Sequence, residues 1–488
     1  MYNDVPRNSK FYDAIEFLQC AGIMTGSANG NFNPNASLSW AEAFVLLYNF
    51  DRKLCTHHEY TREYDSEFNQ WFDKDNTNFS WAKPYIYCFV KRQLAPEKEL
   101  WSKRLGNSIP THCFISFIKL LDSKLADFIH NLPYSIIYSE KLNRENAAFV
   151  LYTAIQTKAS KLENAIEQHL QSGEFSEALS VIRSSRFYFS CFHPDFSRMA
   201  NLLLEDSPSS DLYIKFIHDL ILYKQSLQLD KSKAEPIYHY TSLATLENLS
   251  SGSKFRAYHT EYLNDPNEGK RIMSLLDSYN LGQRYPGWTP LKEQSSGVFL
   301  VSFIRNSNDS LPMWSQYGGQ YAGCCLEFDS STIPYALYDV IYDESVFKGY
   351  LDAIFQILDK YKIALSEARI PLDPQSDPVF LFTQDILNFI RYLYKDQAFE
   401  NEQEVRLLIF GDLRSAYAED KIRPGESFPR IFKEINLPRL DKHIATSPIS
   451  IQHIYLGPKV YKPNWVKISL VQRNYPASRI KKSAVELQ

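Results

Sequence analysis

Residues 237–252, IYHYTSLATLENLSSG, decide how the second half of this chain folds. The β-prone run IYHYT predicts a short strand. Thr241 or Ser242 then offers the side-chain oxygen of a helix N-cap, and the spacing of apolar residues in LATLENL predicts an amphipathic helix that ends at Gly252. A strand that leads at once into a helix indicates an α+β domain from residue 236 to residue 488.

The boundary of this domain lies just upstream. Residues 230–236, DKSKAEP, have the composition of a linker, and Pro236 disfavours a helix in the residue before it. Residues 158–235 are predicted to be a helical connector, because apolar residues recur at helical spacing on both sides of Gly173. This pattern is typical of a helical hairpin and resembles one tetratricopeptide-type unit.

A repeated pattern opens the chain. Residues 11–50 read as an amphipathic helix, a Gly-rich turn and a second helix for which Ser39 is a plausible N-cap. The pattern resembles a surface-layer homology repeat, in which a helix ending in Gly-Ile is followed by a G-x-F-x-P turn and a helix carrying a Glu. The matching residues are Gly22, Ile23, Gly30, Phe32, Pro34, Glu42 and Ala43.

Two further copies are predicted, one from Trp71 and Phe72 and one at residues 142–155. Three such units predict one repeat-built helical domain over residues 1–157, since a single helix pair cannot bury its own apolar face. The resemblance implies binding of cell-wall polysaccharide outside the cell. The alternative is a helical scaffold for docking to a trigger or target, or for self-association.

Composition restricts the function classes. The 53 Lys and Arg against 57 Asp and Glu give a net charge of -4, so the chain as a whole has no attraction for nucleic acid or anionic lipid, although local patches stay open. The N-terminal sequence lacks the pattern of a signal peptide, and no stretch reaches the ~20 apolar residues of a membrane helix. We therefore expect a cytoplasmic protein without a membrane partner. The seven cysteines form no Cys-x-x-Cys pair and indicate neither zinc nor a disulfide framework.

The second half carries an ordered series of polar motifs. They are the start Tyr238-His-Tyr-Thr241, the turn Asn264-Asp-Pro-x-Glu268, the Ser302-Phe303 strand, Trp314-Ser-x-Tyr317, Gly323-x-x-x-Glu327-Phe328, Glu402-x-Glu404-x-Arg406 and Leu456-Gly-Pro458. The series resembles the bacterial domain-of-unknown-function family 2971, whose members show these motifs in this order. The resemblance covers nearly all of residues 236–488.

Glu402, Glu404 and Arg406 are two positions apart, so in a strand they would share one face while Val405 and Leu407 point to the core. Such a row forms either a site or a structural ion-pair network. For the other motifs the alternatives are equally plain. A lone histidine in a strand is more often a hydrogen-bonded core residue than a catalyst, an Asn-Asp-Pro turn is common, and aromatic side chains often only pack.

Together, the early His-Tyr-Thr strand, the middle Ser-Phe strand and the late Glu-x-Glu strand resemble the layout of ADP-ribosyltransferases. That resemblance implies NAD as substrate, with His239 gripping a ribose, Tyr317 or Trp314 stacking on nicotinamide, Glu404 as catalytic carboxylate and Glu402 assisting the acceptor. A fixed anion suits this reaction because bond cleavage passes through an oxocarbenium-like state. The predicted binding residues are His239, Tyr240, Thr241, Asn264, Asp265, Ser302, Trp314, Tyr317 and Arg406.

Three functions follow as hypotheses. The first is an NAD-consuming enzyme, an ADP-ribosyltransferase or NAD glycohydrolase, whose helical half recognises a protein or nucleic-acid trigger or acceptor; such an activity suits a toxin or phage-defence effector. The second is a non-catalytic nucleotide-binding sensor. The third is a metal-dependent nuclease or phosphohydrolase that uses Asp265, Glu268, Glu327 and Glu402. No metal site is predicted under the first two.

Overall fold

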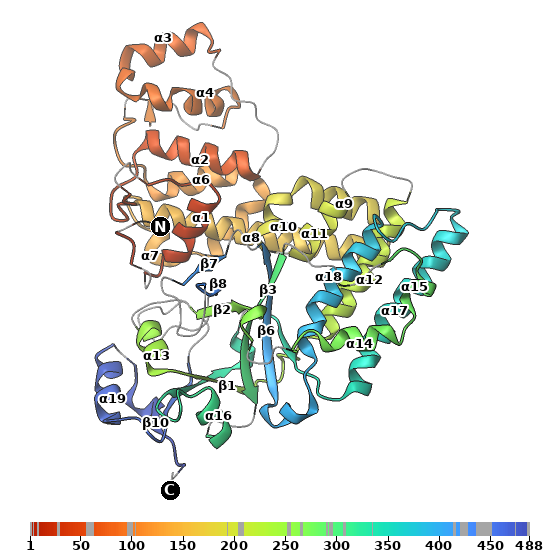
Figure 1. Ribbon diagram of the computed structural model, residues 1–488. Coiled ribbons are helices and arrows are strands. Elements are labelled where there is room, and N and C mark those ends of the chain that lie inside the picture. Colours follow the sequence, from red (N-terminus) through yellow and green to blue (C-terminus); the bar gives the residue numbers. More distant parts are fainter. Residues whose placement is uncertain are drawn as a thin grey trace. The chain divides into compact units, whose positions relative to one another are not determined.

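The computed structural model forms two compact units, residues 1–200 and 201–488. It describes residues 2, 4–6, 9–26, 30–54, 63–94, 101–102, 104–192, 194–203, 209–250, 255–263, 267–288, 291, 296–305, 309–333, 335–412, 416–419, 428–435, 451–473 and 475–485. The first unit is helical and the second combines helices with a sheet (Figure 1), which confirms the predicted fold class. The three predicted domains stay a prediction; helix α8 runs without a break through residues 157 and 158.

The first unit consists of helices joined by turns and 3₁₀ segments. Its helices are α1 Tyr12–Cys20, α2 Trp40–Leu54, α3 Ser66–Asp75, α4 Lys83–Lys91, α6 Thr111–Leu121, α7 Tyr134–Ile137, α8 Arg144–Ser172, α9 Phe175–Ser184, α10 Arg186–Phe192 and α11 Pro194–Leu202, with 3₁₀ segments η1 Thr77–Ala82 and η2 Ser123–Asn131. The predicted cap of α2 is confirmed: the Ser39 hydroxyl accepts from Glu42 N at 3.3 Å, and Glu42 accepts from Ser39 N at 2.9 Å. The predicted hairpin is also present, with Gly173 at φ 79° between α8 and α9.

Backbone hydrogen bonds join three loops of this unit in a ring. Leu38 N donates to Leu142 O (2.8 Å), Ile109 N to Leu38 O (2.9 Å) and Leu142 N to Ile109 O (3.2 Å). Each loop directly precedes a helix, namely α2, α6 and α8. The three side chains are at most 1% exposed and belong to one aromatic-rich core. The loops before α2, α6 and α8 therefore meet at one centre of the first unit, a contact that the sequence motifs did not reveal.

The second unit contains a mixed sheet and a layer of helices. The strands are β1 Pro236–Thr241, β2 Phe255–His259, β3 Ser296–Arg305, β4 Cys324–Asp329, β5 Leu337–Asp339, β6 Glu404–Asp412, β7 Tyr417–Ala418, β8 Ile431–Ile435, β9 His453–Leu456 and β10 Ile480–Lys482. The helices are α12 Ser210–Ser226, α13 Leu243–Ser250, α14 Arg271–Asp277, α15 Leu281–Arg284, α16 Leu311–Gln316, α17 Glu344–Glu367, α18 Pro378–Ile390 and α19 Pro463–Gln472. Short 3₁₀ segments are η3 Thr260–Tyr262, η4 Ser330–Thr332, η5 Arg391–Leu393, η6 Gln397–Glu402 and η8 Ala477–Arg479.

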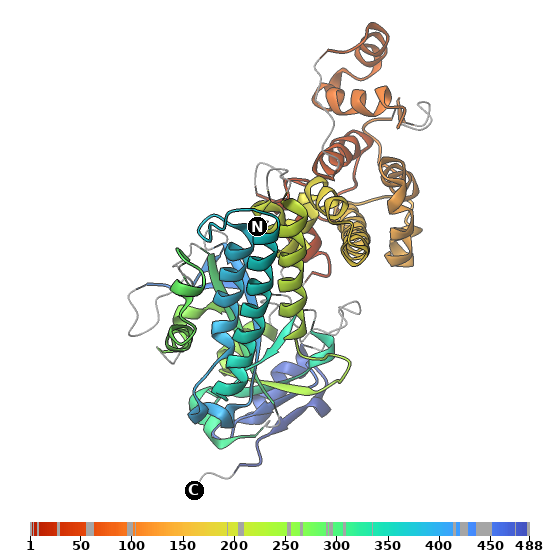
Figure 2. The same ribbon diagram turned by 90° about the vertical axis from the view of Figure 1, so that its right-hand side faces the viewer.

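The strand order is β10-β9-β4-β1-β3-β2-β8-β7, and β6 pairs with both β3 and β5. Only the β9–β10 pair is parallel among the described pairs. One face of the sheet carries an apolar core that includes Phe303 and Val405. On the other face Phe410 of β6 stacks on Phe389 of α18. Figure 2 shows the long helices α12, α17 and α18 side by side in one layer. In the described part of the chain, no helix combines the length and apolarity needed to cross a bilayer.

We predict that Leu142→Ala lowers the free energy of unfolding of the first unit by about 2–5 kcal/mol, because it empties a fully buried position at the ring of loops. Leu120→Ala is the matched control, since Leu120 is 49% exposed and its truncation should change stability by less than ~0.5 kcal/mol. Urea unfolding followed by circular dichroism measures both. Equal effects of the two substitutions would contradict a central role for the ring.

Candidate functional site in the second unit

A cavity of about 1030 Å³ opens where two strands part along one edge of β3. Strand β1 pairs with the end of β3, with Tyr238 opposite Ile304, and β2 pairs with its middle, with Tyr258 opposite Leu300. Among the described strands, residues 301–303 have no partner on this edge. The other edge is paired continuously with β6. Because β1 and β2 separate here, side chains from both faces of the sheet line the same cavity.

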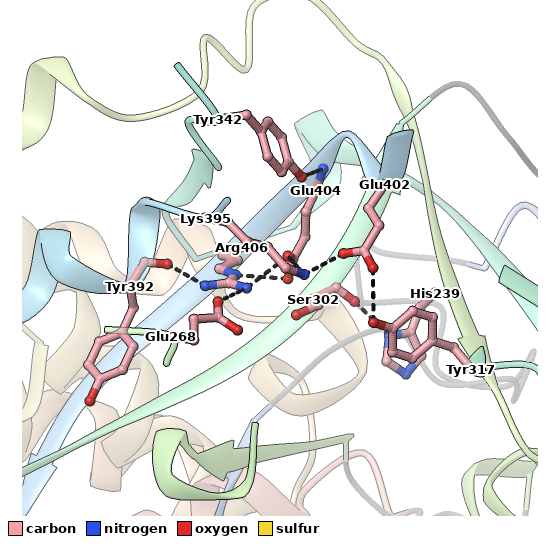
Figure 3. Close-up of polar contacts among 10 residues, drawn as sticks. All are labelled: His239, Glu268, Ser302, Tyr317, Tyr342, Tyr392, Lys395, Glu402, Glu404 and Arg406. Atoms are coloured by element: carbon pink, nitrogen blue, oxygen red, sulfur yellow. Dashed lines mark hydrogen bonds and ion pairs between the residues drawn. The ribbon is translucent and has the colours of Figure 1, made fainter. Parts of the chain in front are cut away.

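A buried charge cluster lies on one side of the cavity (Figure 3). Arg406 of β6 is 1% exposed. Its Nε donates to Glu404 Oε1 at 2.7 Å and its Nη2 to Glu404 Oε2 at 2.8 Å. Nη2 also pairs with Glu268, and Nη1 donates to the carbonyl of Tyr392. A bidentate pair of this kind fixes both groups in position.

Lys395 joins the two predicted glutamates. Its ammonium pairs with Glu402 and lies 3.3 Å from Glu404 Oε2. The chain reaches this arrangement through η6, which Asp396 caps by accepting from Ala398 N at 2.9 Å. Gln403, at φ 42°, then turns the chain from η6 into β6. Segment 391–404 thus supplies two groups that contact Arg406, the Tyr392 carbonyl and the Glu404 carboxylate, and places Lys395 and Glu402 beside them.

The pKa values follow from these contacts. Burial alone would raise the pKa of Glu404, but Arg406 and Lys395, with a hydrogen bond from Ser302, outweigh it and hold the pKa at about 2. Burial raises the pKa of Glu268 despite the attraction of Arg406. Burial would lower the pKa of Lys395, yet Glu404 and Glu402 raise it, so the ammonium stays charged.

His239 lines the cavity from the face of the sheet opposite to the charge cluster. Its Nδ1 lies 2.9 Å from the backbone carbonyl of Ser302, which can only accept, so Nδ1 carries the proton. Burial lowers the pKa of the ring, which is therefore neutral at pH 7. Nε2 then holds a lone pair, and it has no hydrogen-bond partner among the described residues. The ring edge contacts Phe255 and Phe303, at centroid distances of 5.0 and 5.9 Å.

Tyr317, at the end of α16, contacts the charge cluster from within the cavity lining. Its hydroxyl donates to Glu402 Oε1 at 3.1 Å. Burial, together with the charge of Glu402, raises the pKa of this phenol to about 12. Tyr317 therefore remains a protonated donor.

The structure brings most of the predicted residues to one cavity. Its lining includes His239, Tyr240, Thr241, Ser302, Tyr317, Glu402, Glu404 and Arg406. Trp314 is not in the lining: it is fully buried, packs edge-on against Tyr240 at 4.8 Å and donates its indole N–H to Asp309 at 2.7 Å. Asn264 and Asp265 lie outside the described residues.

One local prediction was wrong. Glu402 does not lie in the strand with Glu404 and Arg406 but in the 3₁₀ helix before it, because Gln403 adopts a left-handed conformation. The two glutamates still meet, through Lys395 rather than through strand spacing. The expected burial of Val405 and Leu407 in the core is confirmed.

Sequence reasoning missed several lining residues. Lys395 gave no signal, since a single lysine next to an acidic run is ordinary at a surface. Glu268 was considered only as a metal ligand. Arg256 and Glu419 approach to 3.8 Å at the far end of the cavity, where Arg430 also lines it. These residues come from short strands and loops whose pairing no local motif reveals.

The metal hypothesis gains no support from the described residues, among which no group of three or more His, Cys, Asp or Glu side chains could hold an ion. Glu327 instead accepts from the Tyr455 hydroxyl at 2.7 Å and lies 3.1 Å from His453 Nδ1. The glutamates at the cavity are paired with cationic side chains: Glu402 with Lys395, and Glu268 with Arg406.

We predict that the stability difference between the wild-type chain and Glu404→Gln shrinks as the pH falls. The folded pKa of Glu404 is depressed from 4.5 to about 2, so its contribution, on the order of 3 kcal/mol, is present above pH 4.5 and is lost as the pH falls through about 2. Scanning calorimetry from neutral to acid pH measures the difference. Exposed Glu400→Gln is the control and should stay close to wild type at each pH. A difference that does not depend on pH would contradict this account.

Comparison with protein families gives two matches. Residues 313–407 match the family described as protein of unknown function (DUF2971), and residues 2–44 match the S-layer homology domain. No curated protein matches the chain. Both resemblances seen in the sequence are confirmed over these segments, which are shorter than the predicted domains. The chain thus combines an S-layer homology segment in its first unit with a DUF2971 segment that carries Tyr317, Lys395, Glu402, Glu404 and Arg406.

Proposed function

We propose that the second unit binds NAD in this cavity and cleaves the bond between nicotinamide and ribose, either hydrolysing NAD or transferring ADP-ribose to an acceptor. One observation carries the proposal: His239, Tyr317 and the two glutamates come from distant parts of the sequence and line the same cavity. Its volume of about 1030 Å³ matches the upper range of ligand sites, roughly 300–1,000 Å³, and suits a dinucleotide.

His239 is suited to hold a ribose. Its neutral ring keeps the proton on Nδ1 for the carbonyl of Ser302, so Nε2 accepts a hydrogen bond from a ribose hydroxyl. Thr241 and Ser242, at the start of α13, add hydroxyl groups to the same side of the cavity. The phenol ring of Tyr317 offers an aromatic surface for nicotinamide.

The carboxylates supply the chemistry. The nicotinamide–ribose bond breaks with its electron pair moving to the ring nitrogen, so nicotinamide leaves neutral and positive charge develops on the ribose. The ionised Glu404, held in place by Arg406, stabilises that charge. Water or an acceptor hydroxyl then attacks the ribose carbon, and Glu402 accepts the released proton.

A second candidate is a nucleotide-binding sensor without turnover. It is favoured by one observation, namely that Glu404 is only 5% exposed and both of its oxygens already accept from Arg406. A ligand that raises the melting temperature while remaining intact would support this function, because binding to the native state stabilises it.

Consumption of NAD would harm the cell that contains the protein. We therefore place the activity in a cytoplasmic toxin or phage-defence effector, in which the helical first unit recognises a trigger or acceptor, or drives self-association. The support is architectural: a helical unit with an S-layer homology segment precedes a unit with a large polar cavity.

We predict that the purified chain releases nicotinamide from NAD and that Glu404→Gln slows the release at least ~100-fold, because the fixed anion is lost. Chromatographic detection of nicotinamide measures the rate. Glu402→Gln is the second variant; it keeps an acceptor for Tyr317 and leaves Lys395 paired with Glu404, so the fold is disturbed less.

Glu400→Gln is the matched control for this assay, because Glu400 is exposed on η6 and should leave the rate unchanged. Circular dichroism checks that each variant is folded. NAD that stays intact with the wild-type chain, with or without acceptor proteins and nucleic acids, would contradict the proposal. Equal rates for wild type and both cavity variants would contradict the assigned roles.

We predict that His239→Asn raises the KM for NAD by ~10-fold with little change in kcat. The asparagine amide can still donate to the carbonyl of Ser302, but its shorter side chain places no acceptor at the position of Nε2, which removes about 1.4 kcal/mol of binding. Steady-state kinetics measures the split. His259→Asn, on β2 and outside the cavity lining, is the control. A fall in kcat alone would argue against ribose binding by His239.

A further inference from the structure

Helix α19 presents apolar side chains to solvent. Trp465 is 66% exposed, Ile468 57% and Val471 43%, and Tyr461, just before the helix, is 81% exposed. Spacings of three and four residues place these side chains on one face. The other face is anchored by buried Leu470, which belongs to the core beneath the sheet. Folding of the second unit therefore does not require the exposed face, which we call the α19 face.

The segment of sequence that carries the α19 face is basic. Residues 459–482 contain seven Lys and Arg and no Asp or Glu, although the whole chain has a net charge of -4. The ammonium of Lys462 lies 4.0 Å from the ring centroid of Trp465. Arg473 pairs with Glu247, and Lys459 and Lys481 lie over Tyr321 and Tyr455, which belong to the cluster on the other face of the sheet. Lys462 and Lys467 are therefore the lysines that lie next to the α19 face or within its helix. Figure 1 shows α19 and β10 at the outside of the second unit.

We propose that the α19 face docks on an anionic lipid surface. Indole and phenol rings favour the boundary between headgroups and acyl chains, aliphatic side chains gain from insertion, and lysines gain from anionic headgroups. An anionic lipid surface therefore suits both the exposed apolar side chains of the α19 face and the lysines beside them. The ten residues of α19 span only ~15 Å, so the helix lies in the interface and does not cross it.

Charge argues against the other occupants. Two copies of the α19 face would bring two basic segments together, which opposes self-association. A nucleic acid would satisfy the lysines and stack on Trp465 or Tyr461, but the exposed aliphatic side chains of Ile468 and Val471 gain nothing from it, whereas they gain from insertion into lipid. The expectation of no membrane partner was drawn from the net charge of the whole chain and from the lack of a membrane-length apolar stretch, and neither property detects a local basic and apolar patch.

The test is co-sedimentation of the full chain with vesicles of phosphatidylcholine, with or without phosphatidylglycerol. We expect binding only when phosphatidylglycerol is present, weakening as salt is added. The double variant Trp465→Ser/Ile468→Ser should bind at least ~10-fold more weakly, because the inserted apolar area is lost. Both positions are exposed, so the variant should keep the wild-type circular dichroism and melting temperature.

Tyr134→Ser/Tyr138→Ser is the matched control. It removes two side chains that are 78% and 76% exposed on the first unit and should leave vesicle binding unchanged. Absence of binding to anionic vesicles would overturn the proposal, as would equal binding by the α19 double variant. Equal binding to vesicles without phosphatidylglycerol would overturn the role of the lysines. A shift to dimer or to bound oligonucleotide that depends on Trp465, in place of vesicle binding, would identify a different occupant and also overturn it.

Discussion

The geometry of the second unit depends on the way in which β3 shares its two edges. One edge is paired with β6 from Ser296 to Ile304, and this pairing fixes Arg406 opposite Ser302. The other edge is divided between β1 and β2, which leaves a gap in the ladder. Backbone groups at such a gap need other partners, and the carbonyl of Ser302 finds one in His239. The same gap leaves room for a ligand-sized cavity. The divided pairing of β3 with β1 and β2 thus removes backbone hydrogen bonds from the sheet and also creates the site.

Sequence alone predicted the elements that depend on local patterns. The strand and cap at Thr241 and Ser242, the capping box at Ser39 and the hairpin at Gly173 each follow from a few adjacent residues, and the structure contains them. Most of the candidate site was also predictable, because polar residues that interrupt apolar strands are costly unless they have partners or a function. What could not be predicted is which partners they take.

The ion-pair partners show this limit. Lys395 approaches Glu404 only because Gln403 adopts a left-handed conformation and η6 folds back, and no residue in that segment demands this from sequence. Likewise, the ring formed by Leu38, Ile109 and Leu142 depends on three loops meeting at one centre. Such contacts between distant segments are determined by tertiary packing. Tertiary packing overrides local propensity and cannot be predicted from a local sequence motif.

The charge balance of the cluster bears on the choice between catalysis and binding. Two cations, Lys395 and Arg406, face three carboxylates, so the cluster is neutral while Glu268 is protonated and carries one excess negative charge once it ionises. Because burial raises the pKa of Glu268, this ionisation occurs at higher pH than for an exposed glutamate. Under the proposed cleavage, Glu404 is ionised in both states and would stabilise the developing cation, and an ionised Glu268 would add to that stabilisation. Glu268, although it lies behind Arg406, therefore sets the net charge of the cluster, and its protonation would modulate the binding and the proposed cleavage of a nucleotide.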